Sequence, residues 1–211
     1  MKKIGTLLAL LAVTTVSAQY NYRDSNRIGI GGGINQFDLM TNDIDATPGM
    51  GWNLGLSMRG NFYNDFDMVY GIQFSENKFK VATTSLTGGA EDVEFKLPSA
   101  QISLLLSYKI IESHLSVELG PMIQVNGKLT YDEQNEMNIL RGTTVTADEF
   151  TEVSKFNFYP TIGVTAGLKQ LRVAVMYHYG VNNILSGVSG ADGEKLKANA
   201  GIISANLLIY L

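Results

Sequence analysis

The 211-residue chain contains no cysteine, only 4 prolines and few charged residues, 17% of the total. The absence of cysteine excludes a disulfide scaffold, a thiolate zinc site, a cysteine nucleophile and a lipid anchor on cysteine. A net charge of −4 argues against a nucleic-acid partner, because proteins that bind nucleic acids usually carry a basic excess. Soluble domains contain about 25% charged residues, so something other than charge covers much of this surface.

The N-terminus has the three-part pattern of a secretory signal peptide. The positive pair Lys2-Lys3 precedes a mostly apolar run from Ile4 to Val16, and small residues follow up to Ala18. The apolar run is too short for a membrane-spanning helix. We therefore predict a signal peptide over residues 1–18 and a single exported domain over residues 19–211.

The exported part has neither a long apolar run nor a helical periodicity. Apolar and polar residues instead alternate with a period of two, which is typical of strands with unlike faces. In the clearest segment, Trp52, Leu54 and Leu56 share one face, whereas Asn53 and Gly55 lie on the other. The pattern predicts eight strands, over residues 27–39, 52–62, 66–81, 93–109, 115–126, 155–168, 171–179 and 196–211.

The connections between these strands alternate in length. Short turns are expected at 64–65, 110–113 and 169–170, and long polar loops at 40–50, 82–92, 132–153 and 181–195. This alternation predicts an all-β, eight-stranded antiparallel up-and-down barrel, closed between its first and last strands. The short turns would face the periplasm and the long loops the cell exterior.

The composition of the polar face indicates which face points outward. That face is mostly Gly, Ser, Asn, Thr and Gln, which suit the narrow interior of a small barrel better than a water-exposed sheet surface. The apolar face has aromatic residues near strand ends, including Trp52, Tyr108 and Tyr210, as in transmembrane barrels. We predict an outer-membrane barrel; the alternative is a soluble periplasmic ligand-binding barrel with the faces reversed.

Five ionisable residues fall on the face assigned to the interior, which we call the lumen: Arg59, Glu118, Lys128, Arg172 and His178. A buried charge needs a partner, so Glu118 is expected to face Arg59 or Arg172. We predict that these residues form a structural plug, with gating or proton movement as the alternative.

Other motifs give no catalytic, cofactor or metal site. The run from Gly29 to Gly33 lacks the following helix of a phosphate-binding loop, and its alternate glycines indicate space for bulky neighbours or a bend. His114 and His178 are too few and too far apart for a metal site. The acidic loop 132–153 lacks calcium-loop spacing and is expected to be solvated.

The start MKK…SAQ, the Gly-rich strand RIGIGGGINQF and the series of eight strands resemble the PorT-like outer-membrane β-barrel proteins of Gram-negative bacteria. The resemblance implies the eight-stranded fold and an association with protein secretion, since the namesake takes part in a secretion machinery. It supplies no catalytic residues. The ending Ile209-Tyr210-Leu211 departs from the aromatic terminus of many outer-membrane barrels.

We therefore expect a non-enzymatic outer-membrane protein whose surface loops carry recognition or an envelope- or secretion-related role. Its expected partners are outer-membrane lipid, lipopolysaccharide and envelope or secretion proteins, with no cofactor. A lipid-modifying, deacylase-like barrel enzyme is the alternative, because such enzymes use a His–Ser pair and serine is abundant here.

Overall fold

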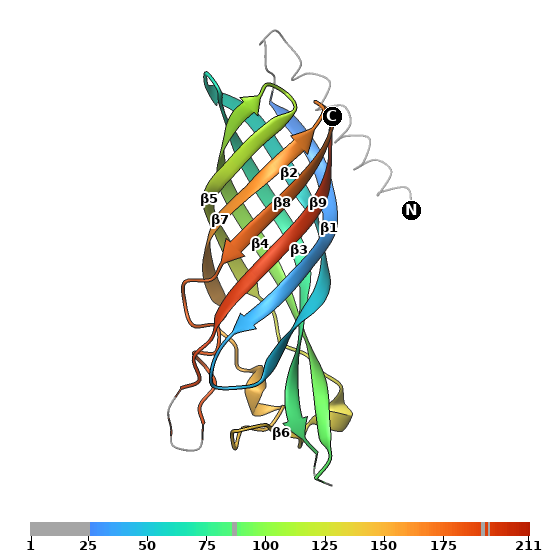
Figure 1. Cartoon of the computed structure of the whole chain (residues 1–211), viewed down its shortest axis with the longest axis vertical. Helices are drawn as coiled ribbons and strands as arrows, with labels where there is room; N and C mark the ends of the chain where they lie inside the picture. The colour runs from blue at the N-terminus through green and yellow to red at the C-terminus, as the bar shows by residue number, and fades with distance from the viewer. Residues whose placement is uncertain (1–25, 86–87, 191–192, 194) are drawn as a thin grey trace, which may run out of the picture.

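The computed structural model describes residues 26–85, 88–190, 193 and 195–211, so the predicted signal peptide over residues 1–18 lies outside the described residues. Each long strand pairs antiparallel with its neighbours, and the pairing of the first with the last closes the ring, which confirms the predicted eight-stranded barrel (Figure 1). The strands of the ring are β1 (Arg27–Met40), β2 (Ala46–Tyr63), β3 (Phe66–Thr84), β4 (Ala90–Ile111), β5 (Leu115–Asn126), β7 (Phe156–Gly167), β8 (Leu171–Tyr179) and β9 (Asn199–Tyr210). In the described part of the chain, no helix is long and apolar enough to cross a membrane.

Short turns close one end of the barrel, which we call the inner end. The β2–β3 turn consists of Asn64 and Asp65, and Asn64 adopts a φ of 45°, which asparagine tolerates better than most residues. Ser113, between β4 and β5, has a φ of 62°. The start of β1 and the C-terminus lie at the same end (Figure 1), whereas the long loops gather at the opposite, outer end.

Glycines in β1 allow close packing against β9, as expected. A Cβ on Gly31 would lie 2.3 Å from the Leu208 side chain, and one on Gly29 would lie 2.8 Å from the Tyr210 ring. At Gly33 the added carbon would lie 1.9 Å from the Ala205 carbonyl oxygen. The absent side chains therefore make room for Leu208 and Tyr210 inside the barrel.

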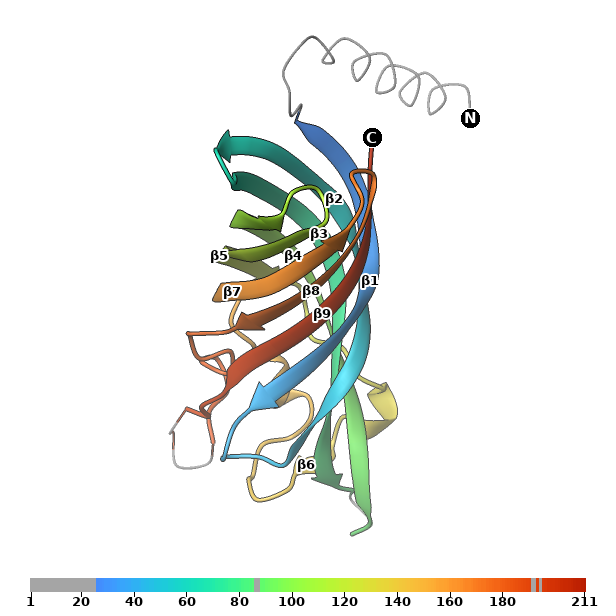
Figure 2. The same cartoon turned by 45° about the horizontal axis from the view of Figure 1, so that its top comes forward.

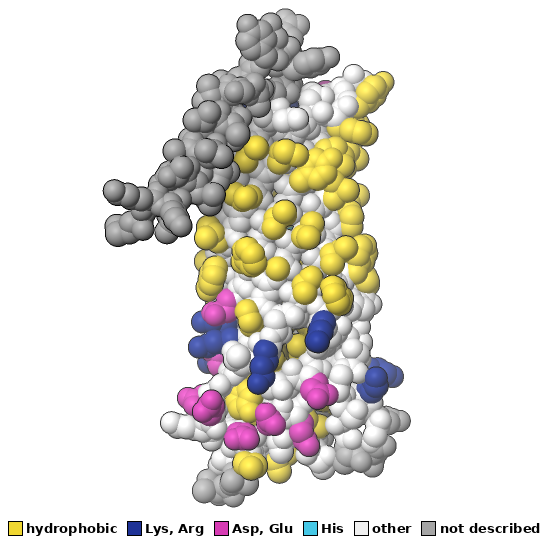
Figure 3. Space-filling view, turned by 180° about the vertical axis from the view of Figure 1, so that it is seen from behind, with side chains coloured by type: hydrophobic (Ala, Val, Ile, Leu, Met, Phe, Trp, Pro, Cys, Tyr) yellow, Lys and Arg dark blue, Asp and Glu magenta, His cyan; other side chains and the backbone are white. Residues whose placement is uncertain are grey.

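The apolar face of each strand points outward over most of the barrel. Leu54 on β2 and Ile72 on β3 are more than half exposed, at 55% and 56%. Asn53, which precedes Leu54 on β2 and points to the other face, is only 5% exposed. Figure 3 shows the resulting band of apolar side chains, which occupies the half of the surface nearer the inner end. The predicted orientation of the two faces is confirmed.

Towards the outer end the two faces exchange character. On β4, Ser99 and Gln101 point into the lumen, but Leu97 and Phe95 point inward farther along the same strand. The outward positions change in the opposite sense, from Ile102 to the charged Lys96 and Glu94. β3 repeats this inversion, because its outward Phe74 gives way to Glu76 and Lys78, and its inward Ser75 to Phe79.

The inward apolar residues at the outer end form a core with the long loops. The connection between β5 and β7 contributes β6 (Ile139–Leu140), which pairs with the end of β3, and two 3-10 helices, η1 (Glu133–Asn135) and η2 (Glu149–Thr151). Figure 2 shows this connection beside the projecting β3–β4 hairpin. We call this assembly the outer cap. Its buried core includes Phe37, Phe79, Phe95, Leu129, Leu140, Phe150, Ile184 and Leu185.

Three expectations from the sequence are wrong. The loops expected at 40–50 and 82–92 are much shorter, because β2 already begins at Ala46 and the β3–β4 pairing continues to Thr84 and Ala90. Tyr210, expected on the apolar exterior, is 2% exposed and points inward. Its position follows from β9 alternation, in which Ile209 faces outward and Tyr210 therefore faces the lumen.

Candidate functional site in the barrel lumen

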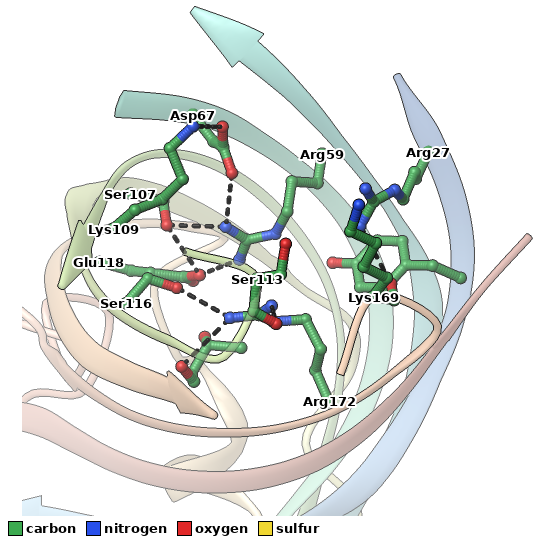
Figure 4. A network of polar contacts seen from close by, with 12 residues as sticks. Arg27, Arg59, Asp67, Ser107, Lys109, Ser113, Ser116, Glu118, Lys169 and Arg172 are labelled. Atoms are coloured by element: carbon green, nitrogen blue, oxygen red, sulfur yellow. Dashed lines mark hydrogen bonds and ion pairs between the residues drawn. The ribbon is translucent and has the colours of Figure 1, made fainter. Parts of the chain in front are cut away.

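A layer of charged and hydroxyl side chains crosses the lumen near the inner end (Figure 4). Arg59 on β2 forms an ion pair with Glu118 on β5, and its guanidinium donates to Ser107 Oγ at 2.7 Å. Both charged residues are almost fully buried, at 6% and 1% exposure. Because a buried charge without a partner is costly, this ion pair ties opposite parts of the wall together.

Asp67 and Lys109 extend this layer towards the rim. Asp67 Oδ2 lies 3.4 Å from the Arg59 guanidinium, and its Oδ1 lies 3.4 Å from Lys109 Nζ. Each of these side chains is 12–13% exposed, more than Arg59 itself. Asp67 therefore links the deeper ion pair to a cation near the inner end.

Arg172 on β8 completes the layer from the other side of the lumen. Its guanidinium donates to the Ser113 carbonyl at 3.1 Å, to Ser116 Oγ at 3.1 Å and to the Thr165 carbonyl at 3.4 Å. All three acceptors are neutral. Side chains from β2, β3, β4, β5 and β8 thus meet in one layer, which we call the inner polar layer.

His178 lies deeper in the barrel and is separate from the ion pairs. One ring nitrogen is 2.8 Å from Thr161 Oγ1 and the other is 3.2 Å from Ser204 Oγ. His178 is 4% exposed and borders an internal cavity of about 70 Å³ that Glu118 also lines. The histidine is therefore enclosed by hydroxyl groups within the lumen, away from the lipid-facing surface.

Lys128 lies outside the inner polar layer, which corrects its expected place in the lumen. It follows the end of β5 at Asn126 and is exposed at the outer end. The even-numbered residues of β5 face the lumen, so Lys128 would also face it if the strand continued. Alternation predicts the direction of a side chain only within a strand, however, and β5 ends before Lys128. The structure thus brings Arg59, Glu118 and Arg172 together, places His178 deeper, and leaves Lys128 outside.

Sequence reasoning missed Ser116 on β5 and three further participants in the layer on β3 and β4. Asp67, Ser107 and Lys109 all occupy inward positions near the inner ends of their strands. The odd-numbered residues of β3 and β4 face the lumen, and Asp67, Ser107 and Lys109 are all odd-numbered. Their positions could therefore have identified them, and Asp67 pairs directly with Ser107 across the two strands. Farther towards the outer end the apolar residues of both strands move from the outward to the inward face. This change weakens the overall alternation of apolar and polar residues and makes the inward positions harder to recognise from sequence.

The acidic residues of the loop between β5 and β7 mostly stabilise its local turns. Asp132 accepts a hydrogen bond from Gln134 N at 3.2 Å, and Glu149 accepts one from Thr146 N at 3.0 Å. Tyr131 donates its hydroxyl proton to Asp148 at 3.2 Å, and partial burial together with this carboxylate raises the tyrosine pKa. No group of three or more potential metal ligands occurs in the described part of the chain.

Comparisons with known proteins agree with the barrel architecture. A family model described as "Outer membrane protein beta-barrel domain" matches residues 17–186. The crystal structure of Neisserial surface protein A, from Neisseria, superposes with a TM-score of 0.51 at 13% identity, covering 86% of this chain and 96% of that one. The attachment invasion locus protein Ail of Yersinia pestis gives a TM-score of 0.44 at 13% identity, with 88% and 99% covered. No curated protein sequence matches the chain.

These comparisons also decide between the two expected locations. At 13% identity, the similarity to Neisserial surface protein A shows a shared fold and nothing more specific. The family match covers most of the chain, and the apolar exterior suits lipid rather than water. The soluble periplasmic barrel considered as an alternative is therefore wrong. The chain belongs to the outer membrane protein beta-barrel domain family and is an outer-membrane β-barrel protein of Gram-negative bacteria.

Proposed function

We propose that this protein is a non-enzymatic membrane anchor that presents a folded recognition surface, the outer cap, outside the outer membrane. The observation that carries the proposal is the inversion of polarity along β3 and β4, which gives the outer end its own apolar core. Loops that only connected strands would need no such core. Functional sites commonly lie on loops held by a rigid scaffold.

A wide pore is a poor alternative for this barrel. An eight-stranded barrel has an interior just wide enough for its own side chains. Here the core of the outer cap fills the outer end, and ion pairs cross the lumen near the inner end. Both features support a plugged barrel whose function lies at its surface.

The lipid-modifying alternative has little geometric support. The His178–Ser204 contact faces the lumen, and both side chains are nearly inaccessible, at 4% and 2% exposure. An acyl chain in the membrane would have to pass the barrel wall to reach them. His114 is exposed at the inner end, far along the barrel from the outer leaflet, and contacts the Glu112 carbonyl.

The expected partners of the outer cap are envelope or secretion proteins, in keeping with the resemblance to PorT-like proteins. A photo-crosslinking amino acid at Met137, which is 58% exposed on the cap, should form adducts with such a protein in living cells. The same amino acid at the lipid-facing Leu104 is the matched control and should give no protein adduct. The absence of cap-specific adducts, together with altered lipid A acylation in cells lacking the protein, would favour the enzyme.

Lipopolysaccharide is the second expected partner, and the charges beside the apolar band support it. Lys78 and Lys96 are direct cross-strand neighbours on the outward face, although like charges in this position repel. Their exposed carboxylate neighbours lie 3.4 Å and 4.0 Å away, so the pairs are weak. Figure 3 shows basic side chains gathered along the outer edge of the apolar band.

Phosphate groups of the outer leaflet would relieve this repulsion. Replacing Lys78 and Lys96 with glutamine should weaken binding of purified lipopolysaccharide, whereas Lys169→Gln at the inner end should not. Dephosphorylated lipopolysaccharide should show no difference between the variants. Equal binding of phosphorylated lipopolysaccharide by all three proteins would remove this part of the proposal.

A further inference from the structure

The inner polar layer contains more positive than negative charge. Among the described residues, its buried and partly buried side chains are three cations, Arg59, Lys109 and Arg172, and two carboxylates, Asp67 and Glu118. The described rim residues Arg27 and Glu112 add one charge of each sign, so the excess within the described part of the chain stays at one positive charge. A buried cationic excess is unfavourable in a narrow lumen unless an anion or water compensates for it.

Arg172 carries most of this imbalance. Its three hydrogen-bond acceptors are a hydroxyl and two backbone carbonyls, so within the described residues no carboxylate lies within ion-pair distance. Among the residues that the structure describes, neither the Nε atom of Arg172 nor that of Arg59 has a hydrogen-bond partner. Two buried guanidinium groups therefore retain unused N–H donors.

These groups border a pocket near the inner end. Its lining includes the cations Arg59, Lys109 and Arg172, the serines Ser113 and Ser116, and the carboxylate Asp67, which is paired with Arg59 and Lys109. The pocket has a volume of about 30 Å³, enough for about two water molecules and therefore for one small charged group. Rim residues from the start of β1 and the β4–β5 turn also line it, so the pocket is reached from the short-turn end.

We propose that this pocket binds one carboxylate group from the periplasmic side, with Arg172 as its principal partner. A single negative charge balances the excess of one, and a planar carboxylate matches the parallel N–H donors of a guanidinium. Glu112 at the rim opposes ligands of higher negative charge. The inference concerns the opposite end of the barrel from the outer cap, so it stands or falls independently of the proposed function.

The test uses the exported chain refolded in detergent micelles and follows the backbone amide signals of Ser113 and Ser116 by NMR. Acetate is titrated at constant ionic strength, with neutral acetamide as the matched ligand control. We expect saturable shifts with acetate alone. A tripeptide with a free C-terminus, compared with its amidated form, distinguishes a peptide carboxylate from a small free one.

Two variants locate the site. Arg172→Gln should weaken acetate binding at least about tenfold, because a charge-assisted hydrogen bond is lost. Lys169→Gln, an exposed charge change at the same end, should leave the affinity unchanged. Unchanged affinity in Arg172→Gln, or no saturable shift in the unmodified protein, would overturn the proposal.

A third variant keeps the test decisive if Arg172→Gln does not fold, as judged by heat-modifiable gel mobility. Glu118→Gln preserves the shape of the side chain and raises the positive excess from one to two. It should bind acetate more tightly than the unmodified protein. Equal or weaker binding by a folded Glu118→Gln protein would contradict the role of the charge excess.

Discussion

Replacing Phe150 with alanine should unfold the outer cap while leaving the barrel wall intact. Phe150 lies in η2 and is fully buried, with its ring centroid 5.1 Å from that of Phe95 and 6.2 Å from that of Phe79. Both partners belong to the projecting β3–β4 hairpin. Truncating a fully buried phenylalanine costs about 3–5 kcal/mol, because transfer free energy is lost and a cavity remains.

Hydrogen exchange measures this cost locally. Each 1.36 kcal/mol corresponds to a factor of ten, so exchange of the cap amides should accelerate by roughly two to nearly four orders of magnitude. Suitable reporters are Leu140 N, bonded to the Val145 carbonyl at 2.9 Å, and Ala147 N, bonded to the Asn138 carbonyl at 2.9 Å. Amides of the barrel wall should keep their protection, because every wall strand remains paired on both sides.

Met137→Ala is the matched control for this prediction. Met137 lies in the same loop but is 58% exposed, so its truncation removes little buried surface. Its exchange rates should remain within about threefold of those of the unmodified protein. Acceleration of less than tenfold in Phe150→Ala, or an equal effect of Met137→Ala, would refute the view that this core holds the cap together.

Further predictions concern the wall and the lumen. In a urea titration, Glu118→Gln should lower the free energy of unfolding by roughly 3 kcal/mol, because the buried Arg59 loses its charged partner. Glu112→Gln at the exposed rim is the control and should change this free energy by less than about 0.5 kcal/mol. Gly33→Ala should prevent heat-modifiable barrel formation, since its Cβ would lie 1.9 Å from the Ala205 oxygen, whereas Gly32→Ala, with its nearest contact at 3.2 Å, should fold. In planar bilayers the protein should show no conductance at the level of a wide porin, and such conductance would contradict the plugged lumen.

The sequence predicts the barrel wall well because one physical rule governs it. Lipid outside and side chains inside impose a period of two on every strand, so segments such as Leu171–Tyr179 are recognisable without any relative. The outer part of the hairpin follows the opposite rule. Between Leu97 and Ile102 the apolar positions of β4 change from odd to even numbers, and a pattern search that assumes one phase sees only a weakened strand.

The position of the site is less accessible to sequence reasoning than the wall. Parity places Arg59, Glu118 and Arg172 in the lumen, but it cannot say which side chains reach one another across the barrel. Which side chains meet across the lumen depends on the stagger of the strands around the barrel. The stagger follows from the registers of all eight strand pairings taken together. Lys128 illustrates the remaining difficulty, because its assignment depended on where β5 ends, and strand ends are the least reliable part of such predictions.

The point of inversion also determines how far the recognition surface stands from the membrane. Outward apolar residues on β4 run from Ile102 to Ile110, and nine residues of a tilted strand span roughly 22 Å, close to the apolar band of an outer-membrane barrel. The preceding part of β4, from Ala90 to Gln101, then extends roughly 30 Å towards and beyond the outer surface. A two-stranded ribbon is marginal in water by itself. The projecting hairpin therefore depends on the loop that carries Phe150, and the same contacts that build the outer cap keep its surface in one shape for a partner.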